Sequence, residues 1–107
     1  MKVRSIIAVI ILFIAADAVA DIHPDNEIAI GAYIQITGTE GVGLRLRAGP
    51  GLSTELLFLG EDSEVFQVKD GPKEADGYTW WYIVAPYDDS RAGWAAANFL
   101  TVVPPPP

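Results

Sequence analysis

The sequence contains no cysteine among its 107 residues. Disulfide bridges, thiolate metal sites and cysteine nucleophiles are therefore excluded. A chain of this length is sufficient for one domain at most.

Basic residues are also few: 7 Lys and Arg stand against 14 Asp and Glu, which gives a formal net charge of -7. A protein that binds nucleic acid needs a basic face for the phosphates, so nucleic acid is not expected as a partner. Electrostatic docking on anionic lipid headgroups is disfavoured for the same reason. The charge balance is compatible with a cationic or neutral partner, or with solubility alone.

The only histidine, His23, lies in the polar segment at residues 21–27, which we expect to be a flexible lead-in. No serine of the predicted domain therefore has a histidine partner. Carboxylate pairs such as Asp88 and Asp89 are adjacent in a predicted turn, where the side chains point apart and lack the burial that raises a pKa for acid catalysis. No calcium-loop spacing occurs. The sequence thus predicts a non-catalytic protein with no metal site and no cofactor.

No apolar run is long enough to cross a bilayer comfortably. The longest, Ile6–Ala16, has eleven residues, whereas roughly 20 are needed. Lys2 and Arg4 precede it, and Ala18-Val19-Ala20 follows with the small residues that signal peptidase requires. Residues 1–20 are predicted to be a helical signal peptide, so we expect export to the periplasm, the cell envelope or the outside. Contact with a membrane is expected only through an uncleaved signal peptide.

Aromatic residues gather in one stretch, Gly77–Val84, whose sequence is GYTWWYIV. Aromatic and β-branched side chains suit a half-buried pleated surface, and no helical spacing explains the run. We interpret it as the central strand of the domain. By alternation Trp81 and Ile83 share one face, and Trp80 with Tyr82 and Val84 shares the other. At least one large ring is therefore expected to be accessible to solvent or to a ligand.

Short alternating segments separated by turn residues surround this stretch and indicate an all-β domain over residues 28–103. Residues 70–77 contain Gly, Pro and Asp and are predicted to be a loop. A single 3₁₀ turn is predicted at 96–99. The four prolines at 104–107 cannot donate to a sheet and should form an extended polyproline tail, or the start of a linker. The other predicted strands are Ile28–Thr37, Leu44–Arg47, Glu64–Lys69, Arg91–Ala95 and Leu100–Val103.

Four segments in order resemble the motifs of bacterial SH3 (SH3b) domains. They cover Leu44 to Leu100 and are Gly43–Pro50 (GLRLRAGP, against LNVRSGPS), Glu64–Val68 (EVFQV, against GxxVxV), Gly77–Ile83 (GYTWWYI, against GYTWYKV) and Gly93–Leu100 (GWAAANFL, against GWVSSSYL). The resemblance implies a small five-stranded SH3-like barrel that acts as a binding module in exported proteins. Such domains commonly attach an enzyme to peptidoglycan or to another envelope component. This chain departs from the pattern at Phe99, where a tyrosine is usual, and carries no recognisable catalytic domain.

The resemblance also implies where a ligand would bind. In related barrels the first aromatic of the Trp pair faces a groove between two loops, and Trp80 matches that position. An exposed indole suits sugar faces, peptide stems and proline; the alternative is that Trp80 only covers the end of the barrel. Tyr78 and Phe99 are expected at the edges of the same groove. Acidic residues of the flanking loops could receive an amine or a basic segment, or could simply be solvated; they are Glu40, Glu74 and Asp76.

Three hypotheses for the function follow. The first is a module that recognises peptidoglycan or its peptide stems at the cell envelope. The second is a protein–protein adaptor that binds a peptide of an exported partner. The third is an N-terminal module of a longer chain, whose working domain would follow the proline run.

Overall fold

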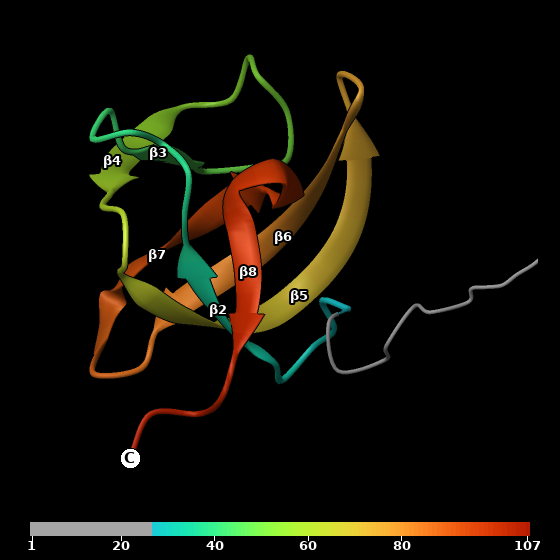
Figure 1. Ribbon diagram of the computed structural model, residues 1–107. Coiled ribbons are helices and arrows are strands. Elements are labelled where there is room, and N and C mark those ends of the chain that lie inside the picture. The colour runs from blue at the N-terminus through green and yellow to red at the C-terminus, as the bar shows by residue number, and fades with distance from the viewer. Residues whose placement is uncertain (1–26) are drawn as a thin grey trace, which may run out of the picture.

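The computed structural model describes residues 27–107, so the predicted signal peptide and residues 21–26 of the predicted lead-in lie outside the described residues. The described chain is all-β, as predicted, and forms one antiparallel seven-stranded sheet in the order β4-β3-β7-β6-β5-β2-β8 (Figure 1). A 3₁₀ helix, η3 (Ala97–Phe99), precedes the last strand. The strands are β2 (Tyr33–Ile36), β3 (Leu44–Arg47), β4 (Leu56–Gly60), β5 (Val65–Ala75), β6 (Tyr78–Ala85), β7 (Asp88–Ala96) and β8 (Leu100–Val103).

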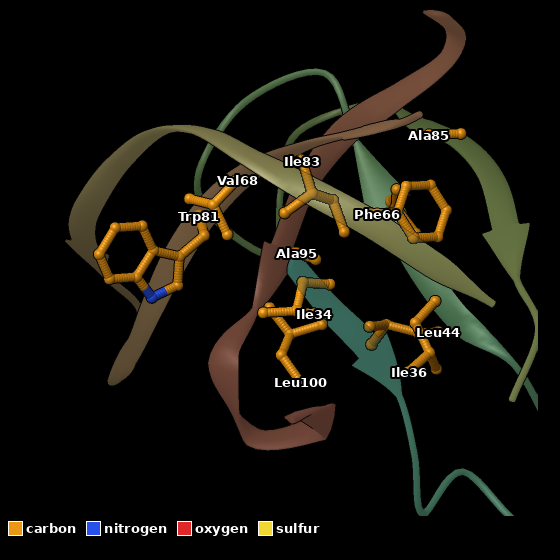
Figure 2. Close-up of a cluster of buried hydrophobic side chains, with 11 residues drawn as sticks. Ile34, Ile36, Leu44, Phe66, Val68, Trp81, Ile83, Ala85, Ala95 and Leu100 are labelled. Atoms are coloured by element: carbon orange, nitrogen blue, oxygen red, sulfur yellow. The ribbon is translucent and has the colours of Figure 1, made fainter. Parts of the chain in front are cut away.

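Alternation along the strands places one row of side chains inside the curved sheet. In β3 the two leucines are buried while Arg45 is exposed and Arg47 is half-buried. In β6, Trp81 and Ile83 point into the core, as the pattern of the aromatic stretch predicts. Figure 2 shows the buried side chains of this cluster meeting inside the curved sheet. The buried cluster consists of Ile34, Ile36, Leu44, Leu46, Phe66, Val68, Trp81, Ile83, Ala85, Ala95 and Leu100.

The prediction of a closed five-stranded barrel is wrong. The sheet has seven strands, and its two outer strands, β4 and β8, are not paired with each other. The difference arises because the connection between β2 and β5 contains a hairpin of its own, β3 and β4, which joins the sheet only through a short pairing of Arg47 with Trp94 in β7. Within that hairpin, Leu46 pairs with Phe58 and Arg47 with Leu56, so Leu57 is an extra residue in a β-bulge.

Side-chain packing brings the end of β4 against β2, although no ladder joins these strands. Gly60 is buried, and a Cβ atom added there would overlap Ile36 Cδ1 and lie 3.1 Å from Leu46 Cδ1. Next to this contact, the Ser63 N–H donates to the Ile36 carbonyl at 2.7 Å and the Ile36 N–H donates to the Glu64 carbonyl at 3.0 Å. The approach of β4 to β2 therefore depends on close packing at Gly60, which has no side chain.

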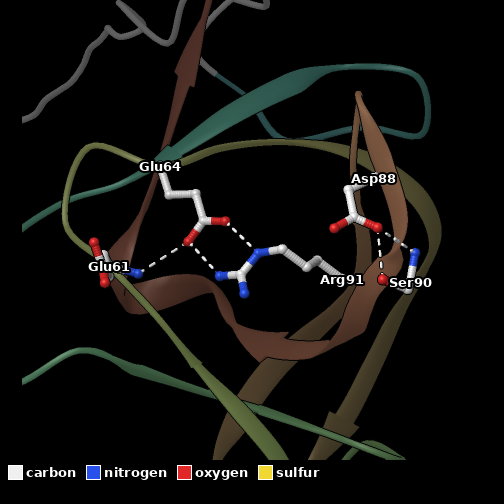
Figure 3. A network of polar contacts seen from close by, with 5 residues as sticks. All are labelled: Glu61, Glu64, Asp88, Ser90 and Arg91. Carbon is white, nitrogen blue, oxygen red and sulfur yellow. Dashed lines mark hydrogen bonds and ion pairs between the residues drawn. The ribbon is translucent and has the colours of Figure 1, made fainter.

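An ion pair lies beside the same region (Figure 3). Arg91 of β7 donates two hydrogen bonds of 2.8 Å to the carboxylate of Glu64, and its guanidinium lies 4.6 Å from the centre of the Phe58 ring. The Glu61 N–H donates to the same carboxylate at 3.1 Å. The hydrogen bonds to Glu64 raise the pKa of Arg91. Arg91 thus connects β7 with the turn before β5 and with β4.

The hairpin of β5 and β6 is longer than predicted. Residues 70–75, predicted as a loop, continue β5, and only Asp76 and Gly77 form the turn. The register shifts around Asp70 and before Lys73 show that the Gly71-Pro72 pair is accommodated in bulges. By contrast, the first predicted strand is shorter: it begins at Tyr33 instead of Ile28, after a turn at Gly31.

The packing of Gly60 can be tested by substitution. Gly60→Ala should lower the free energy of unfolding by about 1–3 kcal/mol, because the added methyl group overfills a packed core. Ile36→Val removes the Cδ1 atom that the methyl group meets, so the double variant should lose less than the sum of the two single losses. Urea denaturation measures both effects.

Gly49→Ala is the matched control, since a Cβ there would lie 3.3 Å from the Thr54 methyl group and touch no core residue. A Gly60→Ala protein as stable as the parent, or strictly additive losses in the double variant, would contradict the packing described here.

Candidate functional site

A cavity of about 440 Å³ lies on the outside of the sheet, between the loop after β2 and the start of β6. We call it the aromatic groove. Its walls come from that loop, from β3, from the turn before β4, from the first residues of β6 and from the end of β7 with η3. The lining residues are Gly38, Thr39, Glu40, Val42, Gly43, Leu44, Arg45, Arg47, Leu52, Tyr78, Trp80, Ala96 and Phe99.

Trp80 forms part of the groove lining but is not exposed. Its side chain is outside the main core cluster, on the opposite face from Trp81, and only 2% of its surface remains accessible. The indole Nε1–H donates to the carbonyl of Ala75 at 2.9 Å, and the Tyr78 ring meets the indole edge-on with 6.2 Å between centres. The prediction of a freely exposed Trp80 indole is therefore wrong: neighbouring residues cover the ring, and its only donor is already used.

Four apolar side chains around Trp80 are accessible instead. The exposed fraction is 37% for Tyr78, 38% for Phe99, 52% for Leu52 and 67% for Val42. Tyr78 stands at the start of β6 and Phe99 at the end of η3, so two elements distant in sequence supply the two accessible rings. These four side chains form the rim of the groove, and Trp80 with the buried Leu44 forms its floor.

Charged groups of both signs border the rim. Glu40 is exposed in the loop after β2, where its backbone has a φ of 56°. Arg45 is exposed on β3. One nitrogen of the Arg47 guanidinium is already engaged, because Nη1 donates to the Thr54 carbonyl at 2.8 Å. The groove therefore combines apolar contact with one carboxylate and guanidinium groups at its border.

Two other predicted site residues lie outside the groove lining. Asp76, in the β5–β6 turn, accepts a 2.7 Å hydrogen bond from the Leu52 N–H. Glu74 accepts a hydrogen bond of 2.9 Å from the Thr79 hydroxyl. The structure thus brings Trp80, Tyr78, Phe99 and Glu40 into one groove, whereas Asp76 acts behind it by holding Leu52 in the rim.

The loop that carries Glu40 and Val42 is anchored by Asp62. The carboxylate of Asp62 accepts hydrogen bonds of 3.1 Å from the backbone N–H groups of Thr39 and Gly41. Thr39 is itself buried and accepts from the Gly43 N–H at 3.0 Å. The hydrogen bonds from Gly41 and Thr39 lower the pKa of Asp62. Because an ionised Asp62 fixes the loop, it also fixes one wall of the groove.

Val42, Leu52 and Arg45 were not expected at the site. Val42 and Leu52 follow glycines in turns, and nothing in their immediate sequence distinguishes an exposed rim residue from a buried one. Arg45 could have been found, because alternation places it on the outer face of β3, which is also the face of the groove.

Within residues 27–107 there is no group of three or more His, Asp or Glu side chains that could hold a metal ion. In the same part of the chain, no helix has the length and apolar character that a membrane span requires.

Comparisons with protein-family models, with curated proteins and with solved structures gave no match to this chain.

The role of Asp62 predicts a pH dependence of stability. The pKa of Asp62 in the folded protein lies below the ordinary value of 3.8. The ionised carboxylate therefore makes its full contribution to folding stability above pH 3.8, and this contribution is lost as the pH falls through the folded pKa. Asp62→Asn should therefore be less stable than the parent at neutral pH, and the difference should shrink below about pH 3. Thermal unfolding measured across this range checks the prediction.

Asp88→Asn is the control that shows whether the loss of Asp62 acts on the groove loop specifically. The pKa of Asp88 is also lowered, by hydrogen bonds from Ser90, but Asp88 lies at the start of β7, away from the groove loop. Amide exchange at Gly41 and Val42 should rise in Asp62→Asn and not in Asp88→Asn. Equal exchange in both variants would show that Asp62 does not hold the loop.

Proposed function

We propose that this protein is a non-catalytic binding module related to bacterial SH3 domains, exported to the cell envelope. Its aromatic groove would hold the peptide stems of peptidoglycan. The observation that carries the proposal is that Tyr78, Trp80 and Phe99 line one groove, whose rim has four accessible apolar side chains including Tyr78 and Phe99.

The arrangement of the strands supports the relation to bacterial SH3 domains. The Trp pair lies in the first half of β6, the Gly93–Leu100 segment runs through the end of β7 and η3 into β8, and the Gly43–Pro50 segment contains β3.

The chemistry of the groove supports a peptide as the ligand. Tyr78, Phe99, Leu52 and Val42 offer apolar surface to small side chains, and the phenol hydroxyl of Tyr78 adds one polar group. Glu40 can pair with an amine and Arg45 with a carboxylate. A peptide stem carries small apolar side chains together with both kinds of charged group, so it matches the rim and its border.

The same chemistry would accommodate a peptide of an exported protein, as in the adaptor hypothesis. The two ligands differ in what should be captured. A peptidoglycan module sediments with purified sacculi and binds soluble muropeptides, whereas an adaptor does neither and retains a specific protein.

Binding can be tested with variants of the rim that leave the core intact. Tyr78→Ala and Phe99→Ala should each weaken binding to muropeptides roughly tenfold, because central aromatic contacts dominate binding energy. Titrations followed by NMR, together with co-sedimentation with intact sacculi, measure the loss. Trp80→Ala is unsuitable, since this buried indole also supports the fold.

Tyr87→Ala is the matched control, because Tyr87 is an exposed aromatic residue in the β6–β7 turn and does not line the groove. It should bind muropeptides like the parent. If the parent protein neither sediments with sacculi nor shows muropeptide-induced shifts, peptidoglycan is excluded as the ligand.

A further inference from the structure

Two arginines lie on one wall of the aromatic groove. Arg45 and Arg47 alternate along β3 with buried leucines, so both side chains are on the outer face of the strand, and both line the groove. Arg45 is exposed, whereas Arg47 is half-buried and its Nη1 donates to the Thr54 carbonyl at 2.8 Å. The β3 wall therefore presents two guanidinium groups to a ligand in the groove.

Neither guanidinium group is paired with a carboxylate of the protein. Within residues 27–107 the one ion pair joins Arg91 to Glu64, and Glu40, although it lines the same groove, pairs with neither arginine. The chain has 14 acidic residues and 7 basic ones, so partners for arginine are plentiful. Two unpaired guanidinium groups in one groove of an acidic protein make a local site for negative charge.

Other hydrogen-bond donors around the groove are already engaged. On the loop wall, the backbone N–H groups of Thr39 and Gly41 donate to Asp62. At the floor, the indole N–H of Trp80 donates to the Ala75 carbonyl. An anionic group in the groove is therefore held chiefly by the guanidinium groups, and its position is fixed at the β3 wall.

The apolar rim lies in the same lining as this charge. A group that satisfies both features combines a carboxylate with a small alkyl substituent. The end of a peptide stem has this form when its last residue is alanine, because the methyl group is attached to the carbon next to the free carboxylate. A stem joined to its neighbour through this carboxyl group carries a neutral amide there instead.

We propose that Arg45 and Arg47 bind the free terminal carboxylate of an alanine-ended stem, so the groove selects stems that are not joined to a neighbour through this group. The inference rests on the proposed function, because it names the part of the stem that the groove recognises. A planar guanidinium group can donate two parallel hydrogen bonds to one carboxylate. Arg45 is fully available for this contact, and Arg47 adds the nitrogens that Thr54 leaves free.

The test compares two forms of one synthetic stem peptide that ends in D-alanyl-D-alanine. One form has a free terminal carboxylate and the other a terminal carboxamide, and both are titrated into the ¹⁵N-labelled protein while the amide signals of Val42, Arg45 and Tyr78 are followed. The free acid should bind about tenfold more tightly, because hydrogen bonds between charged groups are stronger than neutral ones. Added salt should weaken binding of the free acid more than binding of the amide.

Arg45→Gln removes the charge and keeps a long polar side chain. It should reduce the preference for the free acid to about threefold or less, with binding of the amide unchanged. Arg45→Lys keeps the charge without the planar fork and should show an intermediate preference. Lys69→Gln is the matched control, because it removes the same charge from an exposed position on β5 outside the groove lining, and it should keep the preference of the parent.

The two proposals fail separately. Equal binding of the two peptides, or a preference that Arg45→Gln leaves intact, would overturn the inference and leave the proposed function in place. If the free acid binds as expected while muropeptides and sacculi do not, the carboxylate contact stands and peptidoglycan is excluded as its source. If neither the peptides nor muropeptides shift the groove signals, both proposals are refuted.

Discussion

The close packing of Gly60 against Ile36 is the contact on which the architecture depends. Hydrogen bonding alone leaves the sheet open, because β4 and β8 are unpaired outer strands. A buried glycine at the end of β4 lets the edge hairpin approach β2 closely, and the backbone bonds of Ser63 and Glu64 fix the approach. Side-chain packing then encloses the interior at the place where a closed barrel would have a hydrogen-bonded strand pair. Arg91 and Glu64 support this arrangement from the neighbouring surface.

The two adjacent tryptophans lie on opposite faces of β6, one in the core and one at the groove. Trp81 fills the core with Ile83 and Phe66, while Trp80 supports the groove on the other face of the same strand. A one-residue change of register in β6 would exchange these roles, so pairing with β5 and β7 fixes the groove as well as the core. The groove also depends on Asp62 and Asp76, which hold two of its walls through backbone N–H groups.

The all-β class, the faces of the aromatic strand and the 3₁₀ turn were predictable, because each depends on local alternation or turn chemistry. The exposure of Trp80 was not, because its cover comes from Tyr78 and from segments distant in the chain. Of the edge hairpin, the strand Leu44–Arg47 was predicted with the bounds of β3. β4 was not predicted as a separate strand, because Leu56–Gly60 has no alternation of polar and apolar residues that assigns it a face. Asp76 was predicted at the groove but lies outside its lining, and its bond to Leu52 depends on a contact between residues far apart in sequence.

The bulge at Leu57 has a consequence for solubility. β4 is an outer strand with Leu56, Leu57 and Leu59 all exposed, a combination that ordinarily invites stacking of sheets between molecules and fibre growth. The extra residue interrupts the regular spacing of N–H and C=O groups along the free edge, and Glu55 and Glu61 flank the strand with negative charge. A foreign strand therefore finds no uninterrupted template, and the leucines can stay accessible without seeding amyloid.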